Sequence, residues 1–245
     1  MRITACLATF AFALCVGPMG KAQTGGENCT TDAMLVFDGS GSMSEMGYNQ
    51  LNEPRIFSAR RAIRQAMPEI ARSRRVGLII YGPGPTESCS NIDLRFAPIR
   101  DAAPPIINAV DSLEPEGETP LTVSVATAAN VLRYKEKPGV IVLVTDGKET
   151  CGGAPCQLAA ELAADGRDLT VHVIGFKVRG YYFNWDSQGN DDYQNATSVA
   201  RCLADRTGGT YASTETVAEL VGALKTSLGC QIIGAIPATT VRARG

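Results

Sequence analysis

The sequence AMLVFDGSGSM, residues 33–43, joins a short apolar run to a loop of oxygen-bearing side chains. The apolar run is bounded by glycine and serine, which predicts a buried strand of a parallel sheet covered on both faces. Asp38, Ser40 and Ser42 follow at alternate positions, and the glycines between them permit a tight loop. Because ligands of open α/β sheets bind beyond the carboxyl ends of the strands, this spacing predicts a site for a small divalent cation. A serine-rich turn that caps a helix is the structural alternative.

Two later segments also place an oxygen ligand at a loop or strand end. Thr119 lies in GETPL, residues 117–121, just before an apolar helical run, and Asp146 ends the apolar strand VIVLVTD, residues 140–146. In this order the three segments resemble those of the von Willebrand factor A (VWA) family, and the resemblance covers roughly residues 32–228. The stretch TDGKETC, residues 145–151, is similar to a bacterial exported subgroup, which implies a small disulfide-braced loop beside the metal.

The resemblance implies a metal-ion-dependent adhesion site made by five side chains: Asp38, Ser40, Ser42, Thr119 and Asp146. Neutral hydroxyls donate less charge than carboxylates, so the bound ion would favour one more anionic oxygen, supplied by an Asp or Glu of a partner protein. Mg²⁺ suits such a site best, with Mn²⁺ or Ca²⁺ possible. The alternative is that the two carboxylates satisfy their own loops and that Thr119 caps a helix.

The rest of the chain alternates between strand and helix patterns, which predicts an α/β fold with a doubly wound, mostly parallel sheet of about six strands flanked by helices. Residues 92–96 alternate apolar and charged side chains and are expected to form an antiparallel edge strand. Pro68 is expected to kink or shorten the first helix. Besides residues 33–37, the expected strands are 76–81, 92–96, 140–145, 169–175 and 209–212, and the expected helices are 54–70, 104–113, 121–133, 155–164, 194–207 and 217–228.

The N-terminal segment, residues 1–22, has the charge, apolar stretch and small residues of a signal peptide, so we expect a periplasmic or secreted protein. A retained anchor helix and lipidation at Cys15 are the competing interpretations. The VWA domain is then expected to span residues 23–230, with a C-terminal tail at 231–245 that is either disordered or an added edge strand. A formal charge of −2 with interspersed acids and bases gives no indication of nucleic-acid binding.

Cysteine usage agrees with export. Removing residues 1–22 leaves six of the eight cysteines, an even number that can pair in disulfides. Scattered spacing and a lone histidine, His172, argue against a zinc site. The resemblance brings the domain termini together and so implies a Cys29–Cys230 disulfide. The other four are expected to form two disulfides whose pairing the sequence leaves open: Cys89, Cys151, Cys156 and Cys202.

These features favour a metal-dependent protein-binding module that is not an enzyme. The alternative is a metal-dependent hydrolase or an accessory subunit of an enzyme. A hydrolase would need a general base, yet His172 lies within an expected strand, and Glu118 and Glu149 are interpreted as solvated loop acids. A long aromatic loop is expected either to add a second partner contact beside the metal or to fold back over the sheet, through Tyr181, Tyr182, Phe183 and Trp185.

Overall fold

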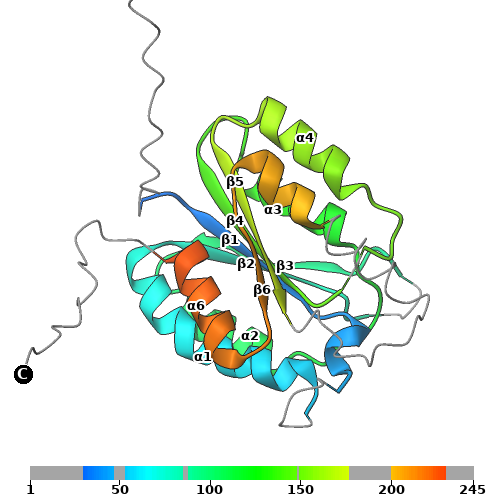
Figure 1. The fold of residues 1–245 in the computed structure, drawn as a ribbon. Helices are drawn as coiled ribbons and strands as arrows, with labels where there is room; N and C mark the ends of the chain where they lie inside the picture. Colours follow the sequence, from blue (N-terminus) through cyan, green and yellow to red (C-terminus); the bar gives the residue numbers. More distant parts are fainter. Residues whose placement is uncertain (1–29, 47–52, 85–87, 148, 177–199, 230–245) are drawn as a thin grey trace, which may run out of the picture.

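Six strands form one mixed sheet in the order β3-β2-β1-β4-β5-β6 (Figure 1). This computed structural model describes residues 30–46, 53–84, 88–147, 149–176 and 200–229. All neighbouring pairs are parallel except β2 and β3, which are antiparallel at one edge of the sheet. The predicted fold class is therefore confirmed. The strands are β1 (Ala33–Asp38), β2 (Val76–Tyr81), β3 (Ile92–Ile99), β4 (Gly139–Thr145), β5 (Leu169–Phe176) and β6 (Tyr211–Thr214).

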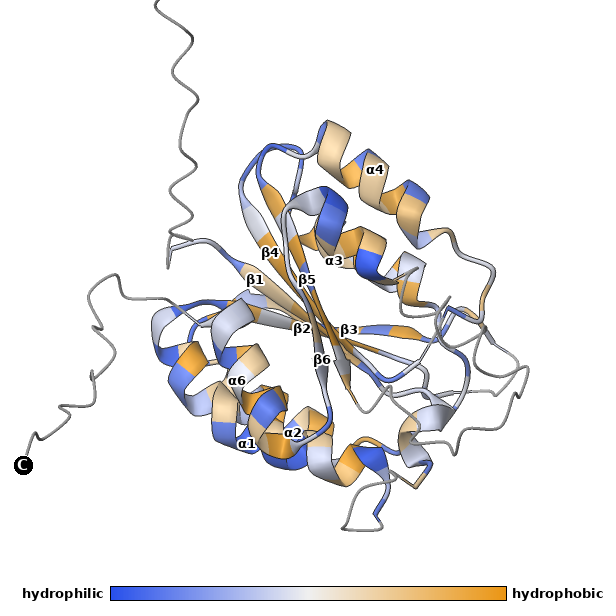
Figure 2. Cartoon of the chain, in the orientation of Figure 1, coloured by the Kyte–Doolittle hydropathy of each residue, from blue (hydrophilic) through white to orange (hydrophobic). Residues whose placement is uncertain are grey.

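Helices cover both faces of the sheet, as the fully buried strands β1, β2 and β4 require. On one face the core joins alternate strand residues to α1 (Arg55–Ser73), α2 (Ala103–Asp111) and α6 (Val217–Leu228). On the other face it joins the intervening strand residues to α3 (Leu121–Val131), α4 (Pro155–Asp165) and a helical segment at 200–207. Figure 2 shows apolar residues concentrated along the strands and on the sides of the helices that face them.

The first helix runs through Pro68 to Ser73, so the expected end at Ile70 is wrong. Pro68 lies on the exposed side of α1, where the lost backbone hydrogen bond falls next to solvent. Met67 and Ile70, on the inner side, are buried against the sheet. Burial of this apolar face therefore outweighs the local disruption by proline.

The strand order reverses between β1 and β4. From β1 the chain moves to β2 and β3 on one side, and β4, β5 and β6 then extend the sheet on the other side. In open α/β sheets a crevice forms at such a reversal, outside the carboxyl ends of the two strands. Asp38 at the end of β1 and Asp146 just after β4 both lie at this place.

Two disulfides link loops and helices on this framework, Cys89–Cys151 and Cys156–Cys202. They supply the pairing that the sequence left open. Several expectations lie outside the described residues: the signal peptide at 1–22, the Cys29–Cys230 disulfide, the aromatic loop and the tail at 231–245. Among the helices described, none is long and apolar enough to cross a bilayer.

Candidate metal centre

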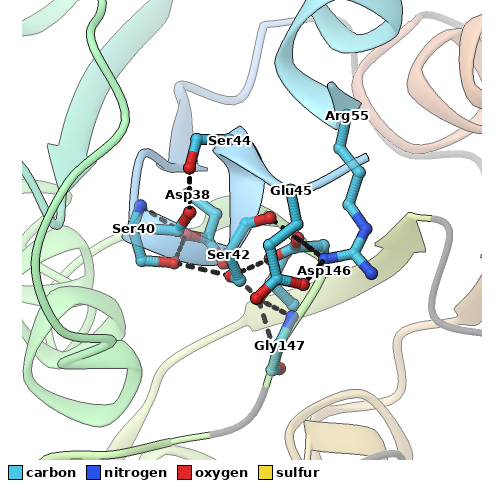
Figure 3. Close-up of polar contacts among 10 residues, drawn as sticks. Asp38, Ser40, Ser42, Ser44, Glu45, Arg55, Asp146 and Gly147 are labelled. Atoms are coloured by element: carbon cyan, nitrogen blue, oxygen red, sulfur yellow. Dashed lines mark hydrogen bonds and ion pairs between the residues drawn. The ribbon is translucent and has the colours of Figure 1, made fainter. Parts of the chain in front are cut away.

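The side-chain oxygens of four of the five predicted ligands lie in one continuous series of close contacts (Figure 3). Ser40 donates to Asp38 Oδ1 through its backbone N at 2.9 Å and through Oγ at 2.5 Å. The hydroxyl oxygens of Ser40 and Ser42 lie 3.1 Å apart, and Ser42 Oγ donates to Asp146 Oδ1 at 2.7 Å. The loop after β1 and the loop after β4 therefore share a cluster of side-chain oxygens.

Asp38 is oriented by its neighbours on the sheet. It continues the strand face of Met34 and Val36, and β1 pairs it with Tyr81 at the end of β2. On the β4 side, Thr145 Oγ1 donates to Asp38 Oδ2 at 2.6 Å. Oδ1 therefore faces the serines while Oδ2 is held by the neighbouring strand. Thr145 is a positioning residue that the sequence pattern did not single out.

Closely packed backbone shapes the loop that carries the two serines. Gly41 N donates to Gly117 O at 3.0 Å, which brings the loop before α3 against the loop after β1. Gly82 adopts a φ of +109°, and a Cβ there would lie 2.4 Å from the backbone N of Ser40. Only glycine fits this position, because a side chain would have to displace the backbone of the loop after β1.

Thr119, the fifth predicted ligand, is buried two residues after Gly117. Its backbone is fixed by the loop after β4, because Thr119 N donates to Thr150 Oγ1 at 2.8 Å. Thr150 N in turn donates to Thr119 O at 3.2 Å. The three segments predicted to converge therefore do meet at one edge of the sheet.

Arg55 is a member of this cluster that the sequence analysis missed. Its Nη1 donates to Asp146 Oδ2 at 2.9 Å, to Ser42 O at 3.0 Å and to Glu45 Oε2 at 3.1 Å. A sequence signal existed, because Arg55 begins α1 directly after Pro54. A cation in the first turn opposes the helix dipole, and such a local conflict often marks a functional site.

The cluster concentrates negative charge in a buried place. Asp38 is fully buried and Asp146 nearly so. Burial, followed by the charge of Asp38, raises the pKa of Asp146 to about 7, even though Arg55 and Ser42 act to lower it. Burial and the charge of Asp38 also raise the pKa of Tyr81 well above its usual range. Two carboxylates with one adjacent guanidinium would be stabilised by additional positive charge.

The donor set fits a hard divalent cation. Two carboxylates and two serine hydroxyls present oxygens only, as Mg²⁺ prefers. Within the described part of the chain, no group of three or more His, Cys, Asp or Glu side chains could hold a metal ion. A site at this edge would therefore depend on hydroxyl ligands, and a zinc site at Cys151 and Cys156 is excluded by their disulfides.

The nearby acids and the histidine have specific partners. His172 Nδ1 lies 2.9 Å from Thr210 Oγ1, as expected of a hydrogen-bonded strand residue. Glu149 was expected to be a solvated acid, but it is partly buried and accepts from Thr122 N at 2.7 Å. Glu118 accepts from Thr150 Oγ1 at 2.6 Å. The expectation of solvated acids was therefore wrong for Glu149, which binds the first turn of α3.

Residues 33–149 match the von Willebrand factor type A domain family, so this part of the chain is similar to a VWA domain. Two relatives from Bacillus subtilis (strain 168) are uncharacterised proteins. YwmD is 27% identical over 198 residues, covering 77% of this chain and 81% of YwmD. YwmC is 28% identical over 159 residues, covering 60% of this chain and 67% of YwmC.

Solved structures of other proteins share the fold at low sequence identity. The pilus adhesin SpaC from Lactobacillus rhamnosus GG has a TM-score of 0.59 and 14% identity, covering 81% of this chain and 30% of SpaC. Another is proximal thread matrix protein 1 from the mussel byssus, whose metal-ion-dependent adhesion site (MIDAS) motif is occupied by zinc. It has a TM-score of 0.54 and 17% identity, covering 82% of this chain and 46% of that protein. This chain therefore spans less than half the length of either structure.

Proposed function

We propose that this chain is a VWA domain that acts as an exported, metal-dependent protein-binding module. A Mg²⁺ ion is held by the side chains that converge at the β1/β4 reversal: Asp38, Ser40, Ser42, Thr119 and Asp146. An Asp or Glu of a partner protein completes the coordination shell. The observation that carries the proposal is the largely buried cluster of two carboxylates and two serine hydroxyls, in which each oxygen lies within 3.1 Å of the next.

Charge balance supports an acidic partner. A divalent cation, the two buried carboxylates and Arg55 together carry a net charge of +1. The Glu45 carboxylate beside Arg55 is 66% exposed and screened by solvent, so a partner carboxylate at the ion remains favourable. Because Mg²⁺ retains exchangeable waters, a partner oxygen can replace one of them without rebuilding the protein site. The fold similarity to a pilus adhesin and to a mussel protein with an occupied MIDAS motif is consistent with this function.

The first experiment measures metal binding by the protein in the absence of a partner. Titration calorimetry with Mg²⁺ and Mn²⁺ is expected to show one site in the unaltered protein and no measurable binding in a Ser40→Ala/Ser42→Ala variant. Ser44→Ala is the matched control, because Ser44 lies on the same short helix but donates to Gly41 O. Absence of metal binding by the unaltered protein would rule out the proposal.

The second experiment tests the partner. Proteins of the exported fraction are captured on the domain in Mg²⁺, and specific partners are expected to elute with EDTA and to be missed by the double-serine variant. Replacing acidic residues of the captured protein should then abolish its binding. Capture that is equal in Mg²⁺ and EDTA would contradict a partner-completed site.

A further inference from the structure

Thr150 forms hydrogen bonds with both the backbone N and the backbone O of Thr119. Its hydroxyl accepts from Thr119 N at 2.8 Å, and its backbone N donates to Thr119 O at 3.2 Å. The same hydroxyl donates to Glu118 Oε2 at 2.6 Å. We call these contacts between Thr150 and residues 118–119 the Thr150 clamp. They fix the loop before α3 against the loop after β4.

Glu149, the neighbour of Thr150, caps α3 from this second loop. The helix begins after Pro120, which makes no side-chain cap hydrogen bond. Glu149 Oε2 accepts from Thr122 N at 2.7 Å and from Thr122 Oγ1 at 2.6 Å, while its Oε1 accepts from Cys151 N at 2.9 Å. A carboxylate at a helix N-terminus is favourable, because it satisfies a free N–H and faces the positive end of the dipole.

The Cys89–Cys151 disulfide anchors the same loop to a third segment. Cys151 follows Thr150 directly, and its partner Cys89 lies between β2 and β3. Packing at this point is close, because a Cβ on Gly153 would lie 2.3 Å from Thr122 Oγ1 and 2.6 Å from Glu149 Oε2. The loop after β4 is therefore fixed on both sides, at α3 and at the β2–β3 connection.

We infer that Thr150 and Glu149 are positioning residues for the metal centre, anchored by the Cys89–Cys151 disulfide. They set the position of Thr119 relative to Asp146, although neither is among the proposed ligands. The inference rests on the proposed function, because it concerns how those ligands are aligned. Reduction or loss of the disulfide would loosen the loop and weaken metal binding while the sheet remains folded.

The test compares two substitutions of one side chain. Thr150→Val keeps the shape but removes the hydroxyl, so Thr119 N loses its acceptor, whereas Thr150→Ser keeps the hydroxyl. Thr127→Val, on the same helix as Thr122, is the matched control, because its hydroxyl bonds only locally to Val123 O. Amide hydrogen exchange of Thr119 is measured in EDTA, and Mn²⁺ affinity is measured by calorimetry.

We expect Thr150→Val to speed exchange at Thr119 and to weaken Mn²⁺ binding about tenfold or more, as for other residues that orient metal ligands. Thr150→Ser and Thr127→Val should behave like the unaltered protein. Unchanged Mn²⁺ affinity in Thr150→Val would overturn the inference, whatever the exchange rate. If the unaltered protein bound no Mn²⁺, the proposed function itself would fail, even with a protected Thr119 amide.

The disulfide is tested with a matched pair of double variants. Cys89→Ser/Cys151→Ser removes the anchor, whereas Cys156→Ser/Cys202→Ser removes the bridge between α4 and the helical segment at 200–207. The first variant is expected to lose Mn²⁺ affinity and Thr119 protection, and the second to keep both. Equal affinities in the two variants would show that the Cys89–Cys151 bridge does not position the site.

Discussion

Arg55 and Ser42 hold opposite oxygens of the Asp146 carboxylate. Arg55 Nη1 donates to Oδ2 at 2.9 Å, and Ser42 Oγ donates to Oδ1 at 2.7 Å. The Asp146 side chain is fully buried and that of Arg55 is 16% exposed, so the ion pair is largely shielded from solvent. Arg55 thus compensates the carboxylate in the metal-free protein and would add a positive charge beside the proposed cation.

Arg55→Gln should destabilise the metal-free protein and tighten metal binding. Breaking a buried ion pair costs about 3–5 kcal/mol, and the partly exposed Arg55 should fall at the lower end. Removing its charge also removes repulsion of a divalent ion. Denaturation in EDTA and in Mn²⁺ measures both effects. The control is Arg64→Gln, because Arg64 lies on the same helix as Arg55 and forms a more exposed ion pair with Asp111 of α2. Breaking that pair should cost about 1 kcal/mol or less. Equal losses in the two variants would contradict a special role for Arg55.

The metal-free protein should become less stable as the pH rises from about 4 to 7. Folding raises the pKa of Asp146 from 3.8 to about 7 through burial and the charge of Asp38, against the pull of Arg55. Between these pH values the folded state binds the Asp146 proton more tightly than the unfolded state does. The stabilisation from this bound proton is therefore present at low pH and is lost as Asp146 deprotonates. Urea denaturation in EDTA at several pH values measures how the free energy of unfolding depends on pH in the unaltered protein and in Asp146→Asn. The same slope in both proteins would show that other groups are responsible.

Gly82→Ala should lower stability and weaken metal binding together. The φ of +109° disfavours any side chain, and the new Cβ would meet the backbone of Ser40. We expect a loss of about 2 kcal/mol or more. Gly222→Ala is the control, because its Cβ would meet nothing within 4 Å in the exposed part of α6, and it should gain about 0.5–1 kcal/mol. Thermal melts measure the stability of both variants, and Mn²⁺ titration measures their metal affinity.

Tyr182→Ala/Trp185→Ala tests the aromatic loop, which lies outside the described residues. If its side chains contact the partner, the double variant should bind the captured protein more weakly at an unchanged melting temperature, because interface aromatics contribute strongly to affinity. A large fall in melting temperature would instead favour packing over the sheet. Mn²⁺ affinity should not change in either case, which separates this loop from the metal centre.

Much of the fold follows from local sequence. The apolar runs at β1, β2 and β4 are buried on both faces, and α6 spans the predicted residues 217–228, because periodic apolar residues determine which surfaces are buried. Boundaries were less predictable. Tertiary packing carries α1 beyond Pro68, and β6 begins two residues later than expected, at Tyr211.

The spacing of residues in the sequence also indicated four of the side chains that form the cluster. Asp38, Ser40 and Ser42 alternate in one loop, and Asp146 ends a buried strand, so local pattern and sheet topology together placed them at one edge. Only the tertiary structure determined the pairing of Cys89 with Cys151, the contact of Arg55 with Asp146 and the Thr150 clamp. These contacts join residues 31 to 91 positions apart in sequence. Local periodicity does not specify such distances, because they depend on the strand order and on how each loop folds over the sheet.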